Sequence, residues 1–137
     1  MNAAFAVPHP LRLVPGDDLR ARIEAIVHER NIAAAFVVCG IGSLSRAAIR
    51  FAGAPQAEIH EGDIEIVSLA GTVSPHGAHL HAALSDASGR VFGGHVALGC
   101  HVRTTAEILL VELPGWTFSR QRDDLTRYPE LVIERLP

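Results

Sequence analysis

The sequence is poor in aromatic residues and in charge, and it contains no run of basic residues. Five Phe, one Trp and one Tyr occur among 137 residues, and 20% of the residues are charged. The net charge is −3, and the closest basic cluster, Arg120-Gln121-Arg122, is followed directly by Asp123-Asp124. A protein that binds a phosphate backbone needs a basic face. The composition therefore argues against a nucleic-acid-binding protein.

Cysteine is also scarce, and targeting segments are not recognisable. Cys39 and Cys100 belong to no Cys-x-x-Cys motif, and each ends an apolar run, so both are predicted to be buried free thiols. Pro8 and Pro10 interrupt the apolar N-terminal stretch, which has no basic start. No segment approaches the ~18 apolar residues of a membrane span. We therefore expect a cytoplasmic protein without membrane contact.

The length and the hydrophobic pattern predict one domain over residues 1–137 with an α+β fold. A helix is expected after Pro15-Gly16, with Asp17 as its N-cap. Its apolar stripe falls at i, i+4, i+7 and i+8, and a left-handed stop is predicted at Asn31. The stripe consists of Leu19, Ile23, Ile26 and Val27. About seven strands follow from the remaining pattern, so the helix packs on a mostly antiparallel sheet. The apolar run 33–40 predicts a strand buried on both faces.

Histidines concentrate in one segment of the chain. His79 and His81 alternate with Leu80 and Ala82, so on a strand both imidazoles share one face. Residues 85–89 have turn composition, and residues 90–98 read as a returning strand that carries His95 directly after two glycines. Glycine within a strand often marks a close backbone approach.

The turn decides whether the three imidazoles meet. A type I turn over residues 86–89, with Gly89 as a left-handed bulge, sets Asp86 opposite Arg90 and His81 opposite His95. A two-residue turn would instead place His95 on the other face. Opposed residues have Cβ atoms about 5 Å apart, which allows their nitrogens to reach one ion.

These residues predict that His79, His81 and His95 bind a divalent transition metal, with zinc as the expected ion. At least one coordination position of the metal is left to water or to a small anion. An open zinc site supports hydrolysis, hydration or a lyase step on a small molecule, or ligand sensing without chemistry. Glu107 is the candidate base or a support for a ligand histidine, unless its face is simply exposed. His76, His101 and the two cysteines are other candidates for a fourth ligand. Without a metal, the histidines are ordinary strand residues.

Several segments resemble the plants-and-prokaryotes-conserved (PPC) domain, the module that follows AT-hook motifs in plant nuclear proteins. The strongest are His79-Leu80-His81 with Leu84-Ser85-Asp86, and the run from Gly89 to His95. Weaker matches lie at 13–19, 40–44, 68–72, 104–107 and 118–124.

The resemblance implies an antiparallel sheet with a packed helix, assembled as a homotrimer. Family members with this histidine pattern look like metal binders, and bacterial members often carry a DNA-binding label. This sequence lacks the Arg-Gly-Arg-Pro AT-hook that reads the minor groove. We therefore expect no sequence-specific DNA binding, and a transcription-associated DNA-binding role is the alternative function.

Overall fold

One helix and eight strands make up the computed structural model, which describes residues 5–137. In chain order the elements are β1 (Val7–Leu13), α1 (Leu19–Glu29), β2 (Ala35–Arg50), β3 (Glu58–Ser74), β4 (Gly77–Ser85), β5 (Val91–Val96), β6 (His101–Glu112), β7 (Trp116–Arg122) and β8 (Pro129–Arg135). All strand pairs are antiparallel. The predicted α+β fold is confirmed, with eight strands where about seven were expected.

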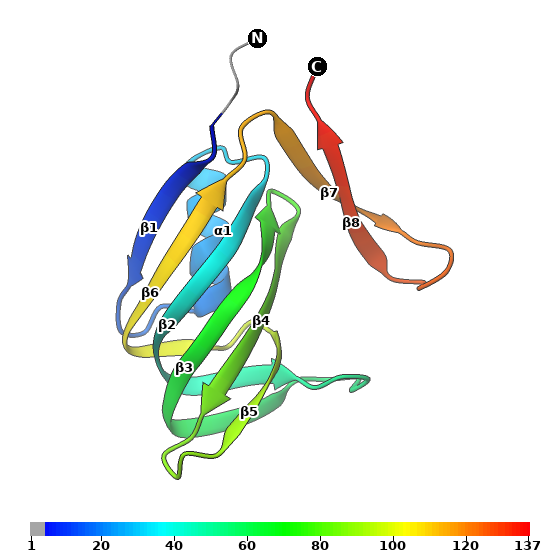
Figure 1. Ribbon diagram of the computed structural model, residues 1–137. Helices are drawn as coiled ribbons and strands as arrows, with labels where there is room; N and C mark the ends of the chain where they lie inside the picture. Colours follow the sequence, from blue (N-terminus) through cyan, green and yellow to red (C-terminus); the bar gives the residue numbers. More distant parts are fainter. Residues whose placement is uncertain (1–4) are drawn as a thin grey trace.

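Six strands form one sheet in the order β1-β6-β2-β3-β4-β5, and β7 and β8 pair only with each other (Figure 1). The end of β2 also pairs with β5, through Ile49 with Val96 and Arg50 with His95. This second pairing joins the edge strand β5 back to β2. The strands β2, β3, β4 and β5 therefore form a closed ring of hydrogen-bonded neighbours.

The helix begins one residue later than predicted. Asp18, not Asp17, is the N-cap, with extended backbone angles and a carboxylate that accepts from the Ala21 amide. Asp18 also accepts from the Gly99 amide, so the cap ties the helix to the segment before β6. Asp17 accepts from the Val14 amide instead. Asp17 therefore stabilises the turn before the helix, and Asp18 caps the helix.

The helix α1 lies against one face of the large sheet (Figure 1). Its predicted apolar stripe is buried. Each fully buried aliphatic side chain contributes about 1.5–3 kcal/mol relative to its exposed state. Asn31 has a φ of 54°, which confirms the left-handed stop after the helix. In the part of the chain that the structure describes, no helix is long and apolar enough to span a membrane.

Within a single chain the strand predicted at 33–40 is buried on one face only, and not on both faces as predicted. Val37 belongs to the core, whereas Phe36 is 38% exposed and Val38 is 52% exposed. Cys100 is buried as predicted, but Cys39 is exposed. A continuous apolar run gives no sign of which strand face lacks a covering layer within the chain.

Candidate metal centre

The hairpin formed by β4 and β5 carries the three histidines. In β4 the aliphatic side chains of Ala78, Leu80 and Ala82 are buried in the core. His79 and His81 alternate with them and lie on the opposite face, as the period of two predicts. The sequence thus fixes which face of β4 presents the imidazoles.

The turn between these strands has the predicted form. The Asp86 amide donates to the Arg90 carbonyl at 3.0 Å, and Gly89 has a φ of 81°. The Asp86 carboxylate accepts from Ser88 and Arg90, and these hydrogen bonds, that of the Ser88 hydroxyl foremost, lower its pKa. The register places His81 directly opposite His95, as predicted. This is the last pair of the β4–β5 ladder, after which β5 turns toward β2.

Gly93 and Gly94 allow β5 to approach two neighbouring backbones at once. A Cβ added to Gly93 would collide with the Ala82 carbonyl oxygen of β4. A Cβ added to Gly94 would lie 2.7 Å from the Arg50 carbonyl oxygen of β2. The close approach that the two glycines predict is therefore present, and it sets the position of the next residue, His95.

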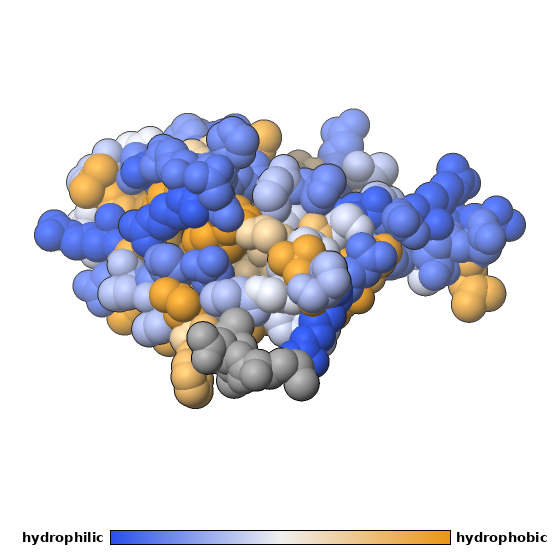
Figure 2. Space-filling view, turned by 90° about the horizontal axis from the view of Figure 1, so that it is seen from above, coloured by the Kyte–Doolittle hydropathy of each residue, from blue (hydrophilic) through white to orange (hydrophobic). Residues whose placement is uncertain are grey.

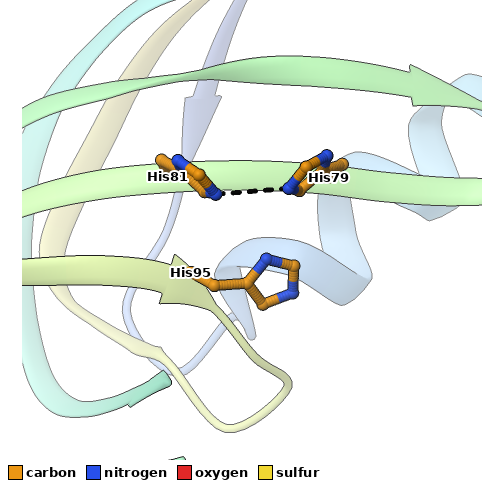
Figure 3. A group of neighbouring side chains, drawn as sticks. All are labelled: His79, His81 and His95. Atoms are coloured by element: carbon orange, nitrogen blue, oxygen red, sulfur yellow. Dashed lines mark hydrogen bonds between the residues drawn. The ribbon is translucent and has the colours of Figure 1, made fainter. Parts of the chain in front are cut away.

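The three imidazoles converge at one point (Figure 3). The Nε2 atoms of His79 and His81 are 3.2 Å apart, and one ligand atom from each of the three rings lies within 4.8 Å of the other two. Two nitrogens bound to one tetrahedral zinc at its usual bond lengths lie about 3.3 Å apart. The His79–His81 spacing therefore fits a shared tetrahedral ion, and a nitrogen of His95 lies within 4.8 Å of both.

The electrostatics of the cluster favour neutral imidazoles. Burial, followed by the charge of Arg50, lowers the pKa of His95 to about 4. Burial and the neighbouring His81 also lower the pKa of His79, while Glu130 opposes this shift. A metal ion binds the neutral form of histidine. At neutral pH these two rings are therefore in the protonation state that a metal requires.

Three arginines from other elements surround the cluster, Arg20, Arg50 and Arg120. Arg50 is the direct partner of His95 in the β2–β5 pair. Arg120 of β7 donates to the Thr72 hydroxyl at 3.1 Å, and Thr72 pairs with His79 across β3 and β4. Arg20 of α1 is paired with Glu24 at 2.9 Å. Its spacing of four residues to Glu24 was visible in the sequence, but the docking of α1 beside β4 was not.

The other sequence-predicted site residues lie elsewhere. Glu107 is exposed on β6, which β2 and β3 separate from β4. His76 is exposed in the β3–β4 turn, and His101 is exposed at the start of β6. Among residues 5–137, the group of potential metal ligands contains His79, His81 and His95 alone. Within one chain, Glu107 therefore has no contact with the imidazoles that would orient them.

Known proteins similar to this chain include the bifunctional protein GlmU of Synechococcus sp. (strain JA-3-3Ab), which is 43% identical over 128 residues. The match covers 93% of this chain and 21% of the other protein, so the chain spans about a fifth of that relative's length. A hypothetical protein from Salmonella enterica has a solved structure that is 41% identical, with a TM-score of 0.93. That alignment covers 98% of this chain and 97% of the Salmonella chain.

Two further structures share the fold at lower identity. A protein of Archaeoglobus fulgidus described as metal-containing is 28% identical with a TM-score of 0.75, over 92% of this chain and 93% of that one. A protein of Ralstonia eutropha JMP134, described provisionally as DNA-binding, is 23% identical with a TM-score of 0.79, over 91% and 90% of the two chains. The latter identity supports a shared fold alone.

The family comparison agrees with the resemblance seen in the sequence. Residues 2–114 match the Plants and Prokaryotes Conserved (PCC) domain, which is the domain abbreviated PPC above. This range contains α1 and all six strands of the large sheet, together with the three histidines. The chain therefore belongs to the Plants and Prokaryotes Conserved domain family.

Proposed function

We propose that His79, His81 and His95 bind a divalent transition metal, with zinc as the expected ion and at least one position left open. The observation that carries this proposal is the 3.2 Å spacing of the His79 and His81 Nε2 atoms, with His95 close by. Three nitrogens without a thiolate are typical of zinc sites that keep an open position, whereas structural zinc sites have four protein ligands. The Archaeoglobus relative that is described as metal-containing gives further support.

The open position is proposed to take a small anion. Bound zinc supplies a Lewis acid that polarises an oxygen ligand and lowers the pKa of bound water to about 7. The charges of Arg50 and Arg120 reach the cluster, which favours a negatively charged partner. Anion binding is better supported than hydrolysis, because Glu107, the predicted base, lies on β6 away from the imidazoles.

Metal analysis tests this proposal. Protein purified without chelator from zinc-supplemented medium is expected to contain about one ion per chain, and His81→Ala and His95→Ala are expected to lose it. Removal of a direct ligand should weaken binding by more than about 100-fold, since outer-shell changes alone cost 10–100-fold. His76→Ala is the matched control, because His76 is exposed and outside the cluster. Wild-type protein without metal, or variants that retain it fully, would refute the site.

We further propose that the chain assembles as a homotrimer. The exposed apolar residues Val38, Ile41 and Val67 support this, because an oligomer would cover them. Light scattering coupled to size exclusion should give three times the 14.7 kDa chain mass. A monomer mass at micromolar concentration contradicts the assembly.

DNA binding is the second candidate function, and the family relationship is the observation that favours it. The net charge of −3 favours the first candidate. In a mobility-shift titration at 150 mM salt we expect no retardation of duplex DNA at micromolar protein. Tight, salt-resistant retardation would reverse the order of the two candidates.

A further inference from the structure

The β7–β8 hairpin, which lies beyond the family match, reaches the histidine cluster through Arg120. Phe118 and Arg120 are two residues apart on β7, so they share the face that turns toward the large sheet. Arg120 is half-buried, and its Nη2 donates to the Thr72 hydroxyl at 3.1 Å. Thr72 and His79 are directly opposed, with Cβ atoms about 5 Å apart. The guanidinium therefore lies beside the imidazoles, on the β3 side.

A second arginine, Arg50, lies on the β5 side of the same cluster. It is opposed to His95 in the β2–β5 pair, so its side chain leaves the sheet on the same face as that imidazole. The contact of its guanidinium with the Ala54 carbonyl is long, at 3.5 Å. Two half-buried arginines thus approach the three histidines from different strands.

Neither Arg50 nor Arg120 has a carboxylate partner among residues 5–137. The other half-buried arginines are paired with acids: Arg20 with Glu24, Arg22 with Glu29 and Arg46 with Glu61. Glu130 of β8 is the acid whose charge reaches His79, and its carboxylate accepts from the Thr126 hydroxyl. Half-buried guanidinium groups that lack an anion retain unused donors in a planar fork, which matches a carboxylate.

We propose that the site binds a small dicarboxylate, with one carboxylate at the open metal position and the other held by Arg120. Arg50 contributes its charge from the opposite side. This inference rests on the proposed metal site and names its ligand class. A divalent ion and two unpaired arginines exceed the single charge of Glu130, so the site carries a net positive charge that suits a dianion. Two separated positive groups favour a ligand with two separated anionic groups over one compact anion.

The dicarboxylate assignment makes Arg120 the residue that distinguishes one-carboxylate from two-carboxylate ligands. The sequence contains no lysine, so every permanently charged basic side chain in the protein is an arginine, able to bind a carboxylate through two parallel hydrogen bonds. Loss of Arg120 removes the second anchor and leaves the metal position intact. A monocarboxylate, which lacks the second contact, therefore loses less affinity in the Arg120 variant than a dicarboxylate does.

Calorimetric titration of the zinc-loaded full-length chain tests the assignment. The probes are acetate, malonate, succinate, glutarate and phosphate at one ionic strength. We expect at least one dicarboxylate to bind about tenfold more tightly than acetate, because it forms one more charge-assisted contact. Arg120→Gln should abolish this difference, with only a small loss of affinity for acetate and with zinc still bound. Arg122→Gln is the matched control, on the same strand but exposed, and should retain the preference.

The outcomes separate the two proposals. If the chain binds no zinc, the metal site fails and the ligand assignment fails with it. If zinc binds but no dicarboxylate exceeds acetate, or if Arg120→Gln keeps the preference, only the ligand assignment is overturned. Phosphate binding more tightly than every dicarboxylate also overturns the assigned class.

Discussion

The two hairpins that meet near the histidines are held in different ways. The β4–β5 hairpin is part of the large sheet, where β4 pairs with β3 and β5 pairs with β2. The β7–β8 hairpin pairs only with itself and projects from the body of the molecule (Figure 1). Viewed from above, its projecting part is largely hydrophilic, with a small apolar patch (Figure 2). Few contacts attach it, chiefly the buried Phe118 and the Arg120–Thr72 hydrogen bond.

In the proposed site, the metal ligands therefore lie on a rigid hairpin, and the arginine proposed to select the ligand lies on a weakly attached one. Metal ligands must hold their positions within a fraction of an ångström, and the hydrogen bonds on both sides of the β4–β5 hairpin provide this. A ligand-selecting arginine needs less precision, so it can come from a hairpin with few anchors. We therefore expect damage to β7–β8 to leave metal binding intact, and damage to β4–β5 to reduce it.

Detaching the β7–β8 hairpin from the large sheet should cause the largest loss of stability. The Phe118 side chain is 2% exposed, and its ring meets that of Phe36 edge to face at 5.5 Å. Phe118→Ala should lower the free energy of unfolding by about 3 kcal/mol, measured by urea denaturation. Proteolysis within residues 115–137 should accelerate, whereas zinc affinity should change by less than about threefold.

Leu125→Ala is the control for this variant, because Leu125 is 94% exposed at the end of the same hairpin. Its stability should stay within about 0.5 kcal/mol of the wild type. If Phe118→Ala lost zinc as completely as the histidine variants, the two hairpins would not be separable.

A substitution in β5 tests the rigid side of the comparison. The new Cβ in Gly93→Ala meets the Ala82 carbonyl oxygen, so β5 has to move away from β4 and carries His95 with it. We expect a loss of about 1–3 kcal/mol in the free energy of unfolding, together with weaker zinc binding. Gly115→Ala, next to β7, is the control: its φ of 83° is unfavourable for alanine, but no atom lies within 4 Å of the added Cβ.

For Gly115→Ala we expect the free energy of unfolding to fall by about 1 kcal/mol. Its zinc affinity, measured by competition with a chromophoric chelator, should be unchanged. Equal zinc affinities for Gly93→Ala and wild type would show that the backbone of β5 does not determine the position of His95.

The pH dependence of the metal-free protein gives the smallest effect. The pKa values of His79 and His95 are lowered in the folded state, that of His95 from 6.5 to about 4, mainly by burial. Between these values the unfolded chain binds protons that the folded chain does not, so stability falls as the pH decreases from 6.5 toward 4. Urea denaturation in chelator at pH 7, 6 and 5 should show this slope. His95→Gln should show a shallower one, and an unchanged slope would contradict the burial of the ring.

The sequence predicted the β4–β5 hairpin down to its register because the determining residues are local. Asp86 and Gly89 specify the turn, and the turn specifies that His81 faces His95. The apolar stripe of α1 was also predictable, because residues close together in the sequence determine it. The cap was misplaced by one residue, because Asp17 and Asp18 are chemically the same and only their contacts in the fold distinguish them.

Contacts between distant segments were not predictable from the sequence. Arg120 and Thr72 are 48 residues apart, and no pattern in either segment indicates that they meet. The pairing of β5 with β2 is equally remote, although Gly93-Gly94 signalled that some backbone would come close. The exposure of Cys39 was missed because an apolar run does not reveal whether its second face is covered within the same chain.

X-ray absorption at the zinc edge of the wild-type protein tests the central claim most directly. Three imidazole nitrogens and one further light atom are predicted at about 2.0–2.1 Å from the zinc ion, which is the usual distance for nitrogen and oxygen ligands. In His95→Ala the contribution of one imidazole should disappear. A sulfur shell at about 2.3 Å, or a spectrum of zinc bound only to water and carboxylate oxygens, would contradict the three-histidine site.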